Sequence, residues 1–368
     1  MRSSYSTEDV IFLLKDITGL VQPQSTEERE KQIQSGRHYS EMLPIEYVPT
    51  EKYMAIYREA LGRYGKQVAD AVGALSDKIL AVRGRNVVLV SLARAGTPIG
   101  ILVRRYIKWK YNVDVPHYSI SIIKGRGIDD NAMRYLLNKY RPEQLLFVDG
   151  WIGKGAILGE LEKAVRAYPG VSSEIAVVAD PAGVTELCGT HEDILIPSSC
   201  LNSTVSGLVS RTFLREDIIG EKDFHGAVYY GELKDSDLSY EFIETIEKNF
   251  TLERLSANSE TVDDGVKGKE AGIAGGSAGP EEKGIDEVRR LAAFFGIEDI
   301  NFVKPGIGET TRVLLRRIPW KVLIDERYRE DPELGHVVRL AEEKHVPVEY
   351  YPLVHYKCCG IIKKIADA

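Results

Sequence analysis

The chain has 368 residues, of which 43% are hydrophobic, and its net charge is −7. That length is enough for two or three domains with cores of their own, and the acidic balance gives no general argument for binding nucleic acid or membranes. No apolar run is long enough to span a membrane, the N-terminus lacks a signal-type segment, and the four cysteines show no metal-ligand spacing, so we expect a reduced cytoplasmic protein.

Residues 1–50 are predicted to form an irregular N-terminal arm, and residues 51–82 have the period of a long helix. Strands and helices then alternate as far as residue 254. Strands are expected at "NVVLVS", "HYSISII", "QLLFVD", "EIAVVAD" and "DILIP", and helices at 97–111, near 131–140 and from Ala156. Continuous Val/Ile/Leu strands are typical of a parallel sheet covered on both faces, so residues 51–254 are predicted to be an α/β domain.

Residues 255–283 are rich in Gly, Ser, Ala and charge, which predicts a flexible linker. After it, "IDEVRRLAAFFGI", "VLLRRI", "WKVLIDER", "HVVRLAEEKH" and "VPVEYYP" predict a second, smaller α/β domain over residues 284–368. The chain therefore reads as an arm, a large domain, a linker and a small domain.

The segment "LLFVDGWIGKGAI" (residues 145–157) places a glycine-rich turn between a strand and a helix. Its spacing fits neither the Walker A pattern nor the dinucleotide fingerprint. Free N–H groups at a helix start favour an anion, and glycines let the backbone approach it. The predicted phosphate contacts are Gly150, Gly153, Lys154, Gly155 and Ala156.

A second loop of the same kind follows the first predicted strand. Arg94 and the backbone of Ala93, Ala95 and Gly96 are predicted to hold a diphosphate there. Between the two loops lies "IIKGRGID", a basic, glycine-hinged segment with Lys124 and Arg126 that is expected to close over a ligand. Loops at the carboxyl edge of one parallel sheet mark the expected ligand crevice.

This order of loops resembles the type I phosphoribosyltransferases, with Asp149 at the position of the first of two family acids and Gly150 replacing the second. The resemblance implies a parallel-sheet enzyme that displaces pyrophosphate from Mg²⁺-bound phosphoribosyl pyrophosphate. Arg94, Lys124 and Arg126 would stabilise the leaving group, and Asp149 would hold ribose hydroxyls or Mg²⁺, through water if need be. The acceptor is left open as a base or nucleoside-like molecule.

The phrases "GRHYSEMLP", "ADPAG", "IPSSCLNSTVSGLVSRTFL" and "DFHGAVYY" resemble phosphoribosyltransferase-like proteins of tellurite-resistance and stress clusters, a group also labelled the cysteine protease StiP family. The second label implies a hydrolase, for which Cys200 and His225 are the candidate nucleophile and base. A simpler interpretation makes Cys200 a thiol in a loop that caps the crevice. A third alternative is a non-catalytic phosphoribosyl or RNA sensor.

Residues 284–368 are similar to the pelota-type kink-turn RNA-binding domains, through "GIGETTR" and a later "VPVEYY". The resemblance implies that structured RNA is a partner. The predicted RNA contacts are Lys304, Gly306, Glu309, Thr311, Arg312 and Arg316. Gly308 stands where that family has a base-contacting asparagine, so the match to the family loop is incomplete.

Overall fold

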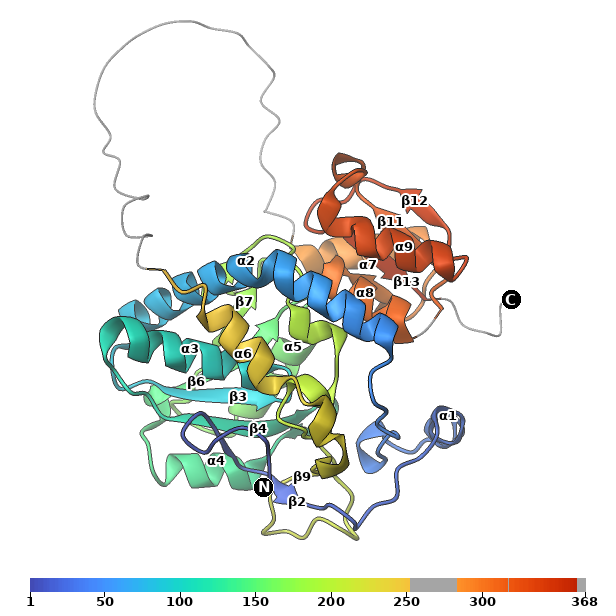
Figure 1. Ribbon diagram of the computed structural model, residues 1–368. Helices are drawn as coiled ribbons and strands as arrows, with labels where there is room; N and C mark the ends of the chain where they lie inside the picture. Colours follow the sequence, from blue (N-terminus) through green and yellow to red (C-terminus); the bar gives the residue numbers. More distant parts are fainter. Residues whose placement is uncertain (252–282, 317, 363–368) are drawn as a thin grey trace, which may run out of the picture.

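The computed structural model describes residues 1–251, 283–316 and 318–362 (Figure 1). Its larger sheet has the order β1(Ile11–Phe12), β4(His117–Ile123), β3(Val88–Ala93), β6(Leu145–Trp151), β7(Ile175–Ala179), β8(Cys188–Thr190), and these strands pair in parallel. A short β5(Gly127–Ile128) folds back antiparallel on β4. The predicted parallel α/β sheet is therefore confirmed, and the segment expected to be a linker lies outside the described residues apart from Lys283.

Alternate residues of the central strands enter two different hydrophobic clusters, as the period of a strand requires. Leu89 and Val148 face the cluster formed with α2(Glu51–Arg83), α3(Gly96–Tyr111) and α6(Ser239–Glu247). Val90 and Phe147 face the cluster formed with α4(Asp130–Leu137) and α5(Ala156–Val165). Helices thus cover both faces of the sheet, and the predicted helices at 51–82, 97–111, near 131–140 and from Ala156 are all present.

Two expectations for the N-terminal domain (residues 1–251) need correction. Residues 1–50 are not wholly irregular, because β1 extends the main sheet, β2(Lys15–Asp16) pairs with β9(Gly226–Ala227) and α1(Thr26–Gln34) is a capped helix. The segment "DILIP" is not a strand; the last strand of the main sheet is β8, a few residues earlier. "DILIP" is apolar because it is a buried loop (residues 193–197), and burial alone does not distinguish a loop from a strand.

The C-terminal domain (residues 283–362) has a four-stranded sheet in the order β10(Val303–Pro305), β13(Cys358–Ile361), β11(Lys321–Ile324), β12(Val348–Tyr350). Its helices are α7(Gly284–Phe294) on one face and α8(Gly306–Arg316) and α9(Gly335–Glu343) on the other. β10 and β13 had no counterpart among the predicted elements. The small α/β domain itself is confirmed.

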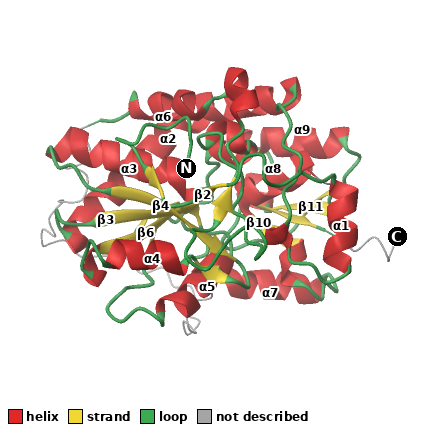
Figure 2. Cartoon of the chain, turned by 90° about the horizontal axis from the view of Figure 1, so that it is seen from below, coloured by secondary structure: helices red, strands yellow, loops and turns green. Residues whose placement is uncertain are grey.

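The two domains share one hydrophobic core. Side chains of α8, α9 and β11, such as Leu314, Val337 and Val322, belong to the same buried cluster as Ile56 and Leu61 of α2. Figure 2 shows the two sheets lying side by side between a row of helices that includes α2, α8 and α9 and a second row that includes α4, α5 and α7. No helix of the described residues is long and apolar enough to cross a membrane.

Candidate functional site

The glycine-rich turn (residues 150–156) lies where the sequence placed it, between the end of β6 and the start of α5. Its surroundings differ from the expectation, because the C-terminal domain covers it. Lys154 Nζ donates to the carbonyls of Ile300 (2.8 Å) and Val303 (3.0 Å), and the Tyr356 hydroxyl donates to Gly153 O (2.6 Å). Lys154 is therefore a bridge between the domains and not a solvated side chain.

A cavity of about 270 Å³ remains between this turn and the C-terminal domain, and we call it the lysine cavity. Lys124, Lys154 and Lys304 line it, together with Asp149 and Glu309. Burial, followed by the positive charge of Lys304, lowers the pKa of Lys154 to about 8, although Glu309 opposes the shift. The cavity thus carries more positive than negative side chains, as an anion site would.

Asp149 also lines the lysine cavity, beneath the C-terminal domain. Its carboxylate accepts the Gly150 N–H at 2.8 Å, and burial raises its pKa to about 7 against that bond and the charge of Arg312. Among the described residues, no group of three or more His, Cys, Asp or Glu side chains is placed to hold a metal. Asp149 is a single carboxyl among lysines, and Mg²⁺ usually binds one or two carboxylates together with substrate phosphates, so the predicted Mg²⁺ contact stays a prediction.

The arginine loop (residues 93–96) runs from β3 into α3, as predicted. Gly96 is required there, because a Cβ would lie 2.3 Å from Val148 O on the neighbouring strand. Arg94 points along the carboxyl edge of the sheet, donating to Val209 O (3.0 Å) and Asn202 Oδ1 (3.1 Å). The loop backbone thus has the predicted position between β3 and α3, while the Arg94 guanidinium already donates to oxygen atoms of the protein. Ala95 lines the lysine cavity.

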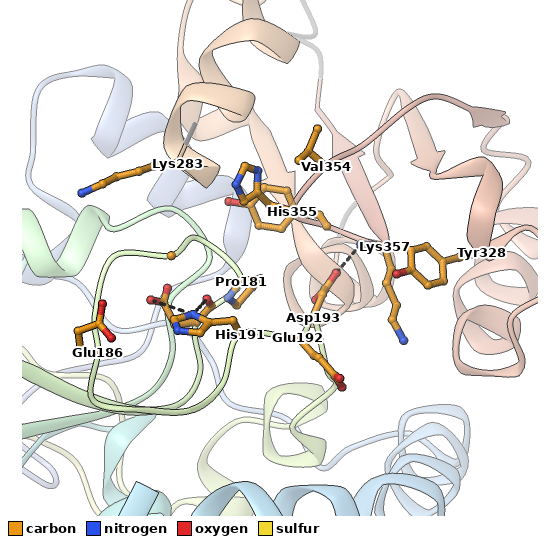
Figure 3. A pocket seen from close by; sticks show the side chains of 13 residues that line it. Pro181, Glu186, His191, Glu192, Asp193, Lys283, Tyr328, Val354, His355 and Lys357 are labelled. Atoms are coloured by element: carbon orange, nitrogen blue, oxygen red, sulfur yellow. Dashed lines mark hydrogen bonds and ion pairs between the residues drawn. The ribbon is translucent and has the colours of Figure 1, made fainter. Parts of the chain in front are cut away.

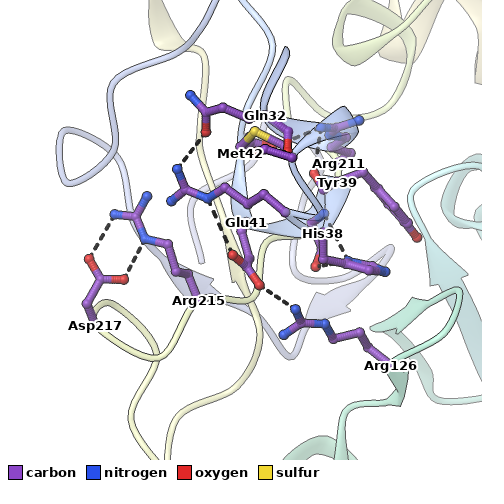
Figure 4. A network of polar contacts seen from close by, with 12 residues as sticks. Gln32, His38, Tyr39, Glu41, Met42, Arg126, Arg211, Arg215 and Asp217 are labelled. Atoms are coloured by element: carbon purple, nitrogen blue, oxygen red, sulfur yellow. Dashed lines mark hydrogen bonds and ion pairs between the residues drawn. The ribbon is translucent and has the colours of Figure 1, made fainter. Parts of the chain in front are cut away.

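The basic segment expected to close over a ligand is a tight turn between β4 and β5. Lys124 Nζ donates to Asn301 Oδ1 at 3.0 Å, and the Gly125 N–H donates to Glu160 at 2.9 Å. Arg126 pairs with Glu41. Figure 4 shows this pair, with His38 and Tyr39 alongside. These bonds fix the segment against the N-terminal residues and against α5, so it does not have the form of an open, hinged loop.

The predicted RNA-contact residues face the N-terminal domain. Gly306, with φ of +85°, lies so close to Asp193 that a Cβ would meet its carboxylate at 2.9 Å. Arg312 pairs with Glu309 and lies over the ring of Trp151. These contacts place the start of α8 inside the interface between the domains.

The remaining members of this set differ in exposure. Arg316 is an exposed residue, although its guanidinium reaches Leu201 O at 3.4 Å. The hydroxyl of Thr311 is buried against His336. Lys304 lines the lysine cavity. The structure therefore brings the predicted RNA set and the predicted phosphate set together, on opposite sides of one interface.

Cys200 and His225 are not brought together. The Cys200 thiol is fully buried in the core shared with α2, and burial raises its pKa to about 12. His225 lies at the end of β4, where its Nδ1 is 2.8 Å from Ser121 Oγ, and burial lowers its pKa. No hydrogen bond joins the two residues in the described parts of the chain.

A different cysteine does meet a histidine. Cys188 Sγ lies 3.4 Å from His191 Nε2 and 3.7 Å from Nδ1. His191 Nδ1 is 3.0 Å from Asp180 O and 3.9 Å from Asp180 Oδ2. The sheet explains this meeting: Ala179 pairs with Thr190, so the residues that follow them, Asp180 and His191, emerge side by side at the carboxyl edge.

This cluster borders a cavity of about 820 Å³ between the two domains, which we call the interdomain cleft (Figure 3). Its N-terminal wall includes Asp180, Glu186, His191 and Glu192. Its other wall is formed by Lys283, Tyr328, Val354, His355 and Lys357. The C-x-x-H spacing of "CGTH", with Cys188 in β8 and His191 directly after it, is the sequence signal for this cluster.

Comparison with known proteins defines the class. Residues 3–247 match the family described as "Tellurite-like stress resistance cysteine protease StiP", and residues 282–364 match the PELOTA RNA binding domain. The first match covers more than half of the chain, so the protein belongs to the StiP family, with a pelota-type domain at its C-terminal end. The resemblances to the StiP family and to the pelota-type domains are confirmed.

A similar protein comes from Acinetobacter baylyi and is named "Cysteine protease StiP". It is 33% identical over 374 residues, which span 98% of this chain and 94% of the relative. A hypoxanthine-guanine phosphoribosyltransferase from Bacillus anthracis is 17% identical and covers 33% of this chain and 71% of its own, with a TM-score of 0.25. A likeness that low supports no conclusion about activity, so the comparisons favour the protease alternative over phosphoribosyl transfer.

Proposed function

We propose that the chain is a thiol peptidase in which Cys188 is the nucleophile and His191 the general base. The observation that carries the proposal is the 3.4 Å contact between the buried Cys188 Sγ and Nε2 of His191, a residue that lines the interdomain cleft. A nucleophile within reach of a base that a third group orients is the arrangement that thiol hydrolysis needs. The name of the family and of the relative supports the same reaction class.

The hydrogen bonds of His191 assign its tautomer. A carbonyl oxygen only accepts, so the 3.0 Å contact with Asp180 O places the proton on Nδ1 and leaves Nε2 free to accept one. The Asp180 carboxylate, 3.9 Å from Nδ1, would stabilise the imidazolium that forms. That carboxylate is itself fixed by the N–H groups of Val184 (2.7 Å) and Thr185 (2.8 Å).

Sγ is nearly as close to Nδ1 (3.7 Å) as to Nε2 (3.4 Å), so it lies beside the imidazole ring, and a turn of the half-exposed ring has to bring the Nε2 lone pair to the thiol before the reaction. Nε2 takes the thiol proton, and the thiolate attacks the carbonyl carbon of the peptide bond to give a tetrahedral intermediate. As the C–N bond breaks, the imidazolium gives its proton to the leaving amine, and a thioester with Cys188 remains. His191 next takes a proton from water, the hydroxide attacks the thioester, and the returned proton regenerates the thiol.

Burial raises the pKa of Cys188 to about 11, so the resting sulfur is a thiol and the thiolate forms only by transfer to His191. The His191 side chain is 54% exposed, which lets its ring turn toward a substrate in the cleft. Burial also raises the thiol pKa of Cys200 and Cys359, each to about 12, and neither has a histidine partner among the described residues. All three thiols are fully buried, and Cys188 differs from the other two in its contact with a histidine that lines the cleft.

The test compares Cys188→Ser, His191→Ala and Cys200→Ala for hydrolysis of a fluorescently labelled unfolded protein. We expect the first two to lose activity by at least about 100-fold, the lower range for a general base, and Cys200→Ala to keep it. His191 is half exposed, so its variant should fold normally by circular dichroism. Full activity in Cys188→Ser, or loss confined to Cys200→Ala, would refute the assignment.

A second candidate function rests on the lysine cavity. Three lysines and the start of α5 favour binding of a phosphate group, as the glycine-rich turn predicted. At about 270 Å³ the cavity is slightly below the roughly 300–1,000 Å³ usual for ligand pockets, so it suits one phosphate group better than the whole of phosphoribosyl pyrophosphate. Calorimetry with phosphoribosyl pyrophosphate and with inorganic phosphate, each with and without Mg²⁺, tests both ligands and the predicted metal.

RNA binding by the C-terminal domain is proposed on the family match alone. The predicted contact residues lie in the interface between the domains, so structured RNA would have to reach another surface of this domain or separate the domains first. Binding of a labelled structured RNA to the whole chain, followed as a function of salt, tests this proposal. Salt should weaken a complex that neutralises phosphates.

A further inference from the structure

The interdomain cleft carries charges that the peptidase chemistry does not use. Glu186 and Glu192 both line it, both are exposed, and Figure 3 shows them on either side of His191. Neither forms an ion pair with a lysine or arginine in the described parts of the chain; Glu192 only receives a 3.4 Å bond from Gln67. Two carboxylates without an ion-pair partner in the described residues therefore flank the proposed base, while Lys78 Nζ donates to the backbone carbonyl of Glu186 at 3.4 Å.

The cations of the opposite wall are largely neutralised by acids of their own domain. Lys357 pairs with Glu333 and, at 3.4 Å, with Asp331. His355 Nδ1 lies 2.9 Å from Glu287 Oε2. Lys283 is then the remaining cation on this wall as far as the chain is described. The cleft as a whole thus presents an excess of negative charge to a ligand.

The same cleft offers apolar surface beside the carboxylates. Pro181 and Tyr328 line it, and Val354 is 61% exposed. A lysine or arginine side chain consists of an apolar stem and a charged head, so it can use both kinds of surface at once. An acidic side chain would meet repulsion from Glu186 and Glu192 in a cavity where low-dielectric walls strengthen the field.

We propose that the interdomain cleft selects polypeptide segments that carry lysine or arginine, with Glu186 and Glu192 as the residues that determine this preference. The claim that such segments are substrates rests on the proposed peptidase function. The claim that the cleft binds them does not depend on that function. Charge complementarity of this kind is expected to act mainly on specificity and on the rate of encounter, and to weaken with salt.

The test measures binding directly, using Cys188→Ala to prevent turnover. Two short labelled peptides of the same sequence, one with two arginines and one with two glutamates at the same positions, are titrated by fluorescence anisotropy at low and high salt. We expect the arginine peptide to bind at least about 10-fold more tightly at low salt, which is the lower end of electrostatic focusing effects. Introducing Glu186→Gln and Glu192→Gln together should remove most of this ratio.

Glu221→Gln serves as the matched control, because Glu221 is an exposed glutamate away from the cleft. It should leave the ratio unchanged. Equal binding of the two peptides, or a ratio that survives the double variant, would overturn the inference. If only the peptidase assignment is wrong, the arginine peptide will still bind through Glu186 and Glu192, but neither the wild-type protein nor any variant will cleave a peptide.

The converse result is equally distinct. If a neutral peptide is hydrolysed, Cys188→Ser abolishes that hydrolysis, and the double variant leaves kcat/KM for arginine and glutamate peptides equal to wild type, then the peptidase stands and the charge preference is wrong. Each of the two claims therefore has its own failing outcome.

Discussion

Replacing Asp193 by alanine should loosen the contact between the two domains. This carboxylate is 6% exposed and accepts the Ile307 N–H at 2.9 Å and the Lys357 N–H at 2.9 Å. Ile307 lies in the first turn of α8 and Lys357 just before β13, so one side chain of the N-terminal domain holds two elements of the C-terminal domain. Alanine would leave both donors without their acceptor.

Two opposing contributions set the size of this effect on the free energy of unfolding. A buried N–H group without an acceptor costs about 1–3 kcal/mol, so two such groups cost roughly 2–6 kcal/mol. Burial raises the pKa of Asp193 from 3.8 to about 6. At about 1.4 kcal/mol per pKa unit, folding is therefore less favourable with an ionised Asp193 than with a protonated one by about 3 kcal/mol. Alanine removes that charge, so its net cost is smaller at neutral pH than in acid.

The sign of the pH dependence is fixed by the raised pKa. A carboxyl whose pKa is higher in the folded than in the unfolded chain contributes stability that is full below its ordinary pKa of 3.8 and is lost as pH rises through about 6. Wild-type stability should therefore fall by about 1.4 kcal/mol between pH 5 and pH 8 from this group alone. This part of the pH dependence should be absent in Asp193→Ala.

Urea unfolding followed by circular dichroism and by tryptophan fluorescence measures these effects. Trp109 lies in α3 and Trp320 precedes β11, so the two domains each carry a fluorescent probe. We expect one cooperative transition for the wild type and an earlier loss of the C-terminal signal in Asp193→Ala, with Asp217→Ala as an exposed control. Two separate transitions in the wild type that the Asp193 substitution leaves unshifted would refute the reasoning.

Three more outcomes are expected. Lys154→Met should lower the free energy of unfolding by about 1.5–3 kcal/mol, because the amine donates to two buried carbonyls; unchanged urea midpoints would contradict this. Iodoacetamide near neutral pH should label Cys188 before Cys200 in peptide mass spectra, and His191→Ala should slow the faster reaction, whereas equal rates would argue against an activated thiol. Thr311→Val should leave RNA binding by the whole chain unaltered, since that hydroxyl is buried against His336; a clear loss in a filter-binding assay would mean that this part of the C-terminal domain opens in solution.

The sequence predicted the layers of the fold well, because long apolar periods are local signals. The helix over residues 51–82 and the strand "HYSISII" each carry their own period or continuous run. The failures are short elements. β13, with the sequence Cys-Cys-Gly-Ile, becomes a strand through its pairing between β10 and β11, which no local pattern encodes.

The candidate site was harder to predict for a related reason. Cys188 and His191 are close in sequence, and their spacing was visible. Asp180 joins them only because β7 and β8 pair in parallel with a particular register. Cys200 attracted attention through its polar neighbours, whereas its side chain turns into the core. Cys188 is buried as well, and what distinguishes it is its contact with His191 at the ends of two paired strands. Strand register is a tertiary property, so a single sequence could propose a thiol but not choose among four.

The role of the glycine-rich turn was also hard to predict from the sequence, because it depends on a tertiary contact. Its departures from the phosphoribosyltransferase pattern, the lost hydroxyls and the added lysine, suggested a compensating phosphate contact. In the structure Lys154 donates to carbonyls of residues 300 and 303, and Gly153 O receives the Tyr356 hydroxyl. A turn that binds the C-terminal domain through these atoms does not need the hydroxyls that would bind a ligand. The same docking completes the interdomain cleft beside Cys188, so a single interface accounts for the altered turn, the buried face of α8 and the second wall of the proposed peptidase site.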